Sequence, residues 1–190
     1  MPARRPRNSA LALAALLGAA VVAFAPDASA RPQVSASGQI GVVGVGEDGY
    51  WSRTKLDLGL RLEDVYLRER PTDFGLGPYV EARSAAFVHA DYGAGLLAIL
   101  PVDPTFPLWV GAGGFARRQD HSWNPGANAF LAWGSRSFNY SSNYAMAFGL
   151  VLDVRVHRGD VPGVDTVLAL SIDLEGLALP WLYAVSAVRR

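Results

Sequence analysis

Three histidines are the first residues to test for chemistry, because histidine carries protons, binds metals and activates nucleophiles near neutral pH. His157 lies beside Asp153 and Arg155 on the polar face of an alternating segment, so it is a candidate proton carrier or a member of a salt-bridge network. His121 is adjacent to Ser122, but neighbours on a strand point to opposite faces and no third orienting group is identifiable. His89 has no companion. We expect no catalytic residues.

Other motifs give equally little chemistry. No His-x-x-x-His spacing, cysteine or acidic calcium loop occurs, so we expect no metal or cofactor. The glycines from Gly41 to Gly46 resemble a phosphate loop, but no helix follows them. Glycines there let a sheet bend or make room for bulky neighbours. Asp173 and Glu175 share a face, and structural pairing with arginine is preferred over a carboxylate dyad.

These residues lie on segments with a period of two. In Arg53–Glu63, Leu56, Leu58, Leu60 and Leu62 occupy one face, and charged residues alternate with them. Such alternation predicts a strand, because a helix would distribute the leucines around its circumference. The same pattern predicts strands at 34–42, 76–88, 92–100, 106–117, 127–138, 144–157 and 164–175, the third to fifth of these with a weaker contrast between faces.

Turn residues separate these strands. The predicted turns lie at 47–49, 70–73, 101–104, 124–126, 141–143 and 158–163, with a short connection at 89–92. The fold class is therefore all-β, an antiparallel up-and-down barrel of about eight strands in one domain, residues 31–190.

The first thirty residues differ from the rest. Three arginines precede an apolar run from Ala10 to Phe24, and small residues follow at 28–30. This order predicts a cleavable secretory signal peptide, residues 1–30. Removing three arginines and one aspartate changes the formal net charge from zero to about minus two, so we expect no nucleic-acid partner.

The chemistry of the two faces favours a membrane barrel over a soluble one. Lys55 is the sole lysine, and the charges of the polar faces nearly balance. In a narrow barrel such charges would have to neutralise one another inside the lumen. The predicted lumen network consists of Arg53, Lys55, Asp57, Arg61, Glu63, Glu81, Arg83, Asp153, Arg155, His157, Asp165, Asp173 and Glu175. Aromatic residues near several strand ends suit an interfacial girdle.

Over residues 33–175 the chain resembles the small eight-stranded outer-membrane barrels, the size class of the OmpA membrane domain and OmpX. The stretch Gly126–Arg155, with the motif Trp-Gly-Ser-Arg-Ser-Phe-Asn-Tyr, also resembles predicted barrels of high-GC Gram-negative bacteria, and no known activity comes with it. Such barrels usually finish on an aromatic residue. Here the chain continues through Pro180 to Arg190, which leaves open whether this tail belongs to the closing strand.

The leading prediction is an outer-membrane barrel with a plugged lumen and a structural or surface-interaction role, not a general porin. Its partners would be outer-membrane lipid or lipopolysaccharide, or a protein at the rim, where the contact residues would be Arg117, Arg118, His121, Trp123, Arg136 and Tyr140. One alternative is a soluble periplasmic or secreted barrel that binds a small apolar ligand in a leucine-lined interior. The other is a lipid-modifying enzyme at His121 and Ser122, the residue types that lipid A deacylases use.

Overall fold

The computed structural model describes residues 33–45, 54–119, 122–136, 148–158 and 163–174. The predicted signal peptide lies outside these residues. Eight strands occupy most of the described chain, and they are β1 (Gln33–Val45), β2 (Thr54–Val65), β3 (Gly75–Ala85), β4 (His89–Leu100), β5 (Leu108–Gln119), β6 (Ser122–Gly134), β7 (Phe148–His157) and β8 (Gly163–Asp173). The prediction of an all-β fold of eight strands is confirmed.

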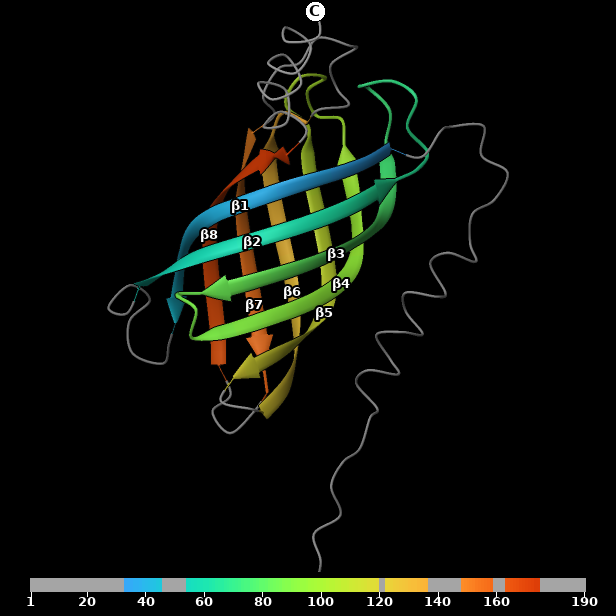
Figure 1. Cartoon of the computed structure of the whole chain (residues 1–190). Coiled ribbons are helices and arrows are strands. Elements are labelled where there is room, and N and C mark those ends of the chain that lie inside the picture. Colours follow the sequence, from blue (N-terminus) through green and yellow to red (C-terminus); the bar gives the residue numbers. More distant parts are fainter. Residues whose placement is uncertain (1–32, 46–53, 120–121, 137–147, 159–162, 175–190) are drawn as a thin grey trace, which may run out of the picture.

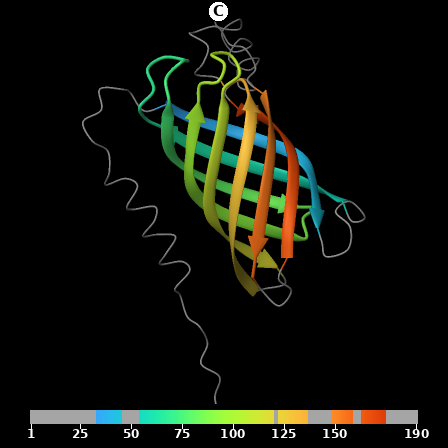
Figure 2. The same cartoon turned by 180° about the vertical axis from the view of Figure 1, so that it is seen from behind.

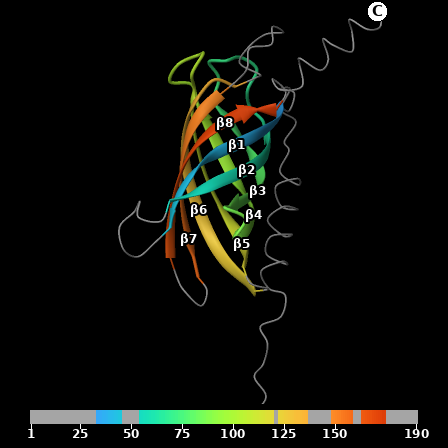
Figure 3. The same ribbon diagram turned by 60° about the vertical axis from the view of Figure 1, so that its left-hand side comes forward.

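The strands form a closed antiparallel barrel in sequence order. Each strand pairs with the next along the chain, and β8 closes the barrel on β1 through a register that runs from Ser37 opposite Asp173 to Val45 opposite Asp165. In Figure 1, β1 to β3 slant across the front wall and β6 to β8 run steeply behind them. Figure 2 shows the steep wall from behind, and Figure 3 shows both walls from the side.

Strict alternation fixes which face of each strand lies inside. In β2 the odd positions from Asp57 to Val65 are buried, whereas Leu56, Leu60 and Leu62 are 46%, 58% and 55% exposed. β7 repeats this pattern, since Phe148, Leu150, Leu152, Val154 and Val156 all face outward. The leucine-lined interior of the soluble alternative is therefore wrong, because the leucines of β2 and β7 face outward.

The outer wall is apolar between two levels of aromatic side chains. On β6, Trp123 and Trp133 both face outward near opposite ends of the strand. Ten residues at about 3.4 Å each, tilted by about 40°, separate the two indoles by about 26 Å along the barrel axis. Tyr92 packs against Trp123 and Phe106 packs against Trp133, with ring centroids 6.0 and 5.7 Å apart. Each end of this side of the outer wall thus carries a pair of aromatic side chains, and each pair is here named an aromatic belt.

Two predicted turns are wrong. Asn124-Pro125-Gly126 lies inside β6, where Pro125 pairs with Ala116 of β5. The carbonyl oxygen of Pro125 accepts a hydrogen bond from the backbone N–H of Arg158 at 2.9 Å. Because N–H and C=O of one residue point to the same side of a strand, the missing N–H of proline faces the end of β7 and costs no bond with β5.

The second misplaced turn joins β3 to β4. It was predicted at 89–92, but β3 ends at Ala85 and β4 already begins at His89. The chain reverses at Ala86 and Phe87, both with positive φ (48° and 60°), and the N–H of Val88 donates to the carbonyl of Ala85 at 2.9 Å. Asparagine and glycine are the residues usual in such a turn, so nothing in Ala-Phe marked the position.

Glycines make room for a buried tyrosine ring. Tyr79 of β3 is buried, and its ring lies against Gly95 of β4 and Gly113 of β5. A Cβ at Gly113 would stand 2.5 Å from the Tyr79 hydroxyl and 2.5 Å from the carbonyl oxygen of Ala94. The glycines thus make room for the tyrosine inside the barrel.

No helix among the described residues has the length and apolarity that crossing a membrane would need.

Candidate functional site

The candidate site is the cluster of charged side chains inside the barrel, here named the interior charge network. Its members are buried residues of six strands and of the segment after β6, namely Asp57, Arg61, Glu63, Glu81, Arg83, Asp91, Arg117, Arg136, Asp153, Arg155 and Asp165. The strand residues project inward because they lie at the alternating positions whose side chains face the lumen. Arg136 is also buried, two residues after the end of β6.

Arg155 of β7 lies at the centre of the network, only 2% exposed. Its Nη1 donates to Glu81 at 2.7 Å and to Asp153 at 2.9 Å, and its Nε donates to Asp91 at 3.1 Å. One guanidinium therefore bridges carboxylates of three strands, β3, β4 and β7. Charged hydrogen bonds of this kind are the strong ones, and they tie opposite walls of the barrel together.

Two further arginines hold the same carboxylates from the side of β2 and β3. Arg61 donates to Glu81 at 2.8 Å. Arg83 pairs with Asp57, donates to Gln39 at 2.6 Å, and lies 3.6 Å from Asp153. Glu81 and Asp153 thus each contact two guanidinium groups, which offsets the cost of burying their charge.

Arg117 of β5 extends the network toward the end of the barrel where β3 turns into β4. It donates to both carboxylate oxygens of Asp91, at 2.7 and 2.9 Å, and its Nη2 lies 2.6 Å from Asp165. His157 is half-buried, with its Nε2 3.9 Å from Asp165. At this distance the imidazole is an outer member of the network.

Aromatic rings fill the space between the charges. The guanidinium carbon of Arg61 lies 3.8 Å from the ring centre of Phe130, and that of Arg155 lies 4.4 Å from the ring centre of Phe115. The Tyr79 hydroxyl donates to Asn128 at 3.1 Å. Cations over ring faces are stabilised by the ring quadrupole, so the rings both pack and solvate the arginines.

Arg136 closes the opposite end of the network. Its guanidinium pairs with Glu63 and lies 4.9 Å from the ring centre of Trp109. Apolar side chains fill the lumen at this level, namely Val65, Leu97, Ile99, Trp109 and Val151. Burial lowers the pKa of Arg136 to about 10, so the side chain is still charged at neutral pH.

A second buried arginine lies outside the strands, in the connection between β2 and β3. Arg68 donates to the carbonyl oxygens of Arg70 at 3.3 Å and Pro71 at 2.9 Å. Burial lowers its pKa, and the charge of Asp73 opposes that change. Nearby, the Tyr66 hydroxyl donates to Asp64 at 2.6 Å, and this hydrogen bond raises the pKa of Tyr66. These contacts hold the connection against the barrel end.

The structure brings most of the predicted lumen residues together. Asp57, Arg61, Glu63, Glu81, Arg83, Asp153, Arg155, Asp165 and Asp173 are buried. Asp173 accepts a hydrogen bond from the Ser35 hydroxyl at 3.4 Å. Lys55, near the start of β2, is half-buried. Arg53 and Glu175 lie outside the described residues.

The predicted rim contacts need correction. Arg117 and Arg136 are only 2% and 5% exposed, because their registers point them at acidic residues inside the barrel. Arg118 and Trp123 are exposed on the outer wall. His121 and Tyr140 lie outside the described residues. The Ser122 hydroxyl donates to the carbonyl oxygen of Gln119 at 2.8 Å.

The sequence analysis missed Asp91 and the inward role of Arg117. The predicted strand began at Tyr92, one residue too late to include Asp91. The signal was present, because Asp91 alternates with the outward-facing Ala90 and Tyr92. Among the described residues no group of three or more histidine and acidic side chains forms a metal site.

Comparison with known proteins returns structures alone. No family model matches the chain. No curated protein matches it either. The crystal structure of Ail, the attachment invasion locus protein of Yersinia pestis, in complex with the heparin analogue sucrose octasulfate is 11% identical, with a TM-score of 0.43 over 75% of this chain and 98% of that one. The backbone structure of Ail in a phospholipid bilayer nanodisc is 13% identical, with a TM-score of 0.40 over 74% of this chain and 99% of that one.

A de novo designed transmembrane β-barrel gives similar values, with 13% identity and a TM-score of 0.41 over 73% of this chain and 94% of the designed one. Likenesses at this level carry no functional information across to this chain.

Proposed function

We propose that the protein is an outer-membrane β-barrel with a plugged lumen, whose role is structural or surface-interactive rather than that of a general porin. The chemistry of its two faces supports the proposal. The outward positions of β2, β7 and β8 are mostly leucine, valine, isoleucine and phenylalanine, and the charged side chains of these strands point inward, apart from Asp64 near the end of β2.

One observation carries this proposal: the apolar outer wall is continuous from belt to belt. Soluble monomers rarely expose contiguous apolar patches beyond a few hundred Å². Here large hydrophobic side chains more than one-third exposed occur on seven of the eight strands. The hydrocarbon of a bilayer solvates such an apolar wall. The distance of about 26 Å between the two belts also matches the apolar band of about 25 Å in outer-membrane barrels.

The filling of the lumen favours a plugged barrel over a porin. Across its middle, Arg61, Glu81 and Arg155 are buried and paired. Toward one end Ile99 and Trp109 are buried too. A solute path would need these side chains to separate, which would leave charges unpaired in a narrow space. We therefore propose no general pore activity.

The surface-interaction role stays a proposal about the rim and the outer wall. Arg118 and Trp123 combine a cation with an aromatic ring near one belt, a mixture that suits lipid headgroups or lipopolysaccharide phosphates. A protein partner at the rim is an alternative within this proposal. The likeness of Gly126–Arg155 to barrels of high-GC Gram-negative bacteria is also part of the proposal. We propose no enzymatic activity.

Three measurements on the full chain test the proposal. Cell fractionation should place the protein in the outer membrane, and refolding into vesicles should give a band whose electrophoretic mobility changes on boiling. Planar-bilayer recording should then show no stable conductance of porin size. Recovery in the soluble periplasm would contradict the membrane assignment, whereas steady open channels would contradict the plugged lumen.

A further inference from the structure

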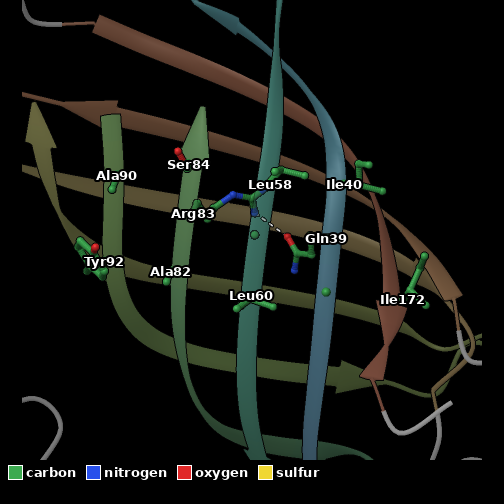
Figure 4. A pocket seen from close by; sticks show the side chains of 12 residues that line it. Gln39, Ile40, Leu58, Leu60, Ala82, Arg83, Ser84, Ala90, Tyr92 and Ile172 are labelled. Carbon is green, nitrogen blue, oxygen red and sulfur yellow. Dashed lines mark hydrogen bonds between the residues drawn. The ribbon is translucent and has the colours of Figure 1, made fainter. Parts of the chain in front are cut away.

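The outer wall contains a hollow of about 500 Å³, here named the outer-wall groove. It crosses β1 to β4 and reaches Ile172 of β8, and Figure 4 shows its lining side chains. Most of the polar side chains that line it are held by other contacts. Arg83 passes beneath the wall and donates to Gln39 at 2.6 Å, and the Ser84 hydroxyl donates to the carbonyl oxygen of His89 at 3.0 Å. The surface that the groove offers is therefore apolar.

The register shows how the groove is laid across the strands. Tyr92 of β4 pairs with Ala82 of β3, Ala82 with Leu60 of β2, Leu60 with Gly38 of β1, and Gly38 with Ile172 of β8. Five strands span four spacings of about 4.8 Å, so the groove is about 19 Å long. The groove is recessed relative to the surrounding wall because two of these five positions, Ala82 and Gly38, have small side chains or none.

The groove also runs obliquely along the height of the apolar wall. Ala90, which lines one end, is the second residue of β4 after the tight β3–β4 turn. Ile172, at the other end, is the last residue but one of β8, at the opposite end of the barrel. A line across tilted, staggered strands climbs along the barrel axis. The groove therefore rises through the apolar band. Its length of about 19 Å is comparable to the hydrocarbon depth of one bilayer leaflet, which is about 15 Å.

A cation stands at the Ala90 end of the groove. Arg118 of β5 pairs in register with Ala90 and is exposed on the outer wall. Its cross-strand neighbour on β6 is Trp123, whose ring packs against Tyr92. No carboxylate of the described residues forms an ion pair with Arg118. One end of the groove is thus positive and aromatic, and the remainder is apolar.

We propose that the outer-wall groove binds one anionic phospholipid, with an acyl chain along the groove and the headgroup phosphate at Arg118. The proposal rests on the proposed membrane location. An apolar channel with a single cation at one end matches an amphiphile with one negative headgroup, and the indole and phenol at that end suit the headgroup level. The surrounding leucine wall lacks a groove that ends at a cation, so we expect lipids on that wall to exchange freely.

Lipid retention by the full-length protein tests this. The barrel is refolded into vesicles of phosphatidylethanolamine and phosphatidylglycerol, extracted in mild detergent, and its bound lipids are counted by native mass spectrometry. Ala82→Phe fills the groove and Arg118→Glu reverses its cation. Ala129→Phe, on the outer wall of β6, and Arg158→Glu, an exposed arginine after β7, are the matched controls.

We expect one phosphatidylglycerol on the unaltered protein and both controls, and about a tenfold or greater loss of retention in Ala82→Phe and Arg118→Glu. Equal retention of the two phospholipids, or equal retention by groove variants and controls, would overturn the proposal. A protein that inserts into vesicles but retains no lipid would overturn this inference alone. A protein that does not insert at all would refute the proposed function as well.

Discussion

Replacement of Arg155 by methionine tests whether the interior charge network stabilises the barrel. Arg155 contacts Glu81, Asp91 and Asp153 at 2.7, 3.1 and 2.9 Å. Each carboxylate keeps one other arginine after the change, so none is left wholly unpaired. Breaking a buried ion pair costs about 3–5 kcal/mol, and we expect Arg155→Met to lower the free energy of unfolding by about 4 kcal/mol.

Urea unfolding of the refolded barrel in lipid vesicles, followed by tryptophan fluorescence, measures this loss. Arg158→Met is the matched control, because Arg158 is an exposed arginine after the end of β7. Adding Glu81→Gln to Arg155→Met should recover part of the loss, since it removes one of the carboxylates that lost a partner. A loss below about 1 kcal/mol for Arg155→Met would refute the reasoning, since it would mean that water already solvates these charges.

Three other perturbations address the wall, the interior packing and the part-buried hydrogen bond between Tyr66 and Asp64. Leu152→Arg, in the middle of an outward face, should cost about 2–4 kcal/mol of stability in bilayers by urea titration, and insertion without loss would contradict a lipid-facing wall. Gly113→Ala should cost about 1–3 kcal/mol through overpacking, whereas Gly114→Ala, with its nearest atom 3.6 Å from the added Cβ, should be tolerated; equal effects would contradict the packing account. Because Asp64 raises the pKa of Tyr66 above its ordinary value of 10.0, the contribution of this hydrogen bond is complete below about pH 10 and is lost as the pH rises through the folded pKa. Spectrophotometric titration should show Asp64→Asn lowering that pKa, and an unchanged value would disprove the assignment.

The strands with strict alternation were predictable from sequence. β2 separates leucines from charges at every position between Leu56 and Glu63, so both its existence and its two faces could be predicted. The middle strands were harder, because β4 and β5 alternate small with large residues. There the start of β4 was placed too late, and Asp91 was missed.

The partners inside the barrel were beyond sequence reasoning. Alternation states that Arg117 and Arg118 face opposite ways, but it does not state which of them faces the lumen. That choice depends on the pairing of Arg117 with Asp91 across β4 and β5. The contact of Arg155 with Glu81 depends on the stagger of β7 against β3 around the barrel, which no local pattern records.

The pairing of β1 with β8 has a consequence for how the chain assembles. Seven of the eight strand pairs join neighbours in sequence, so each can form as a hairpin. The eighth joins Ser37 to Asp173, residues separated by nearly the whole barrel. Because closing a long loop costs more chain entropy than closing a hairpin, we expect this pair to form last, after the hairpins. Until that step the edges of β1 and β8 are unpaired. We therefore expect closure of this strand pair to limit the rate of assembly, and we expect the open edges to be the place where another chain could pair.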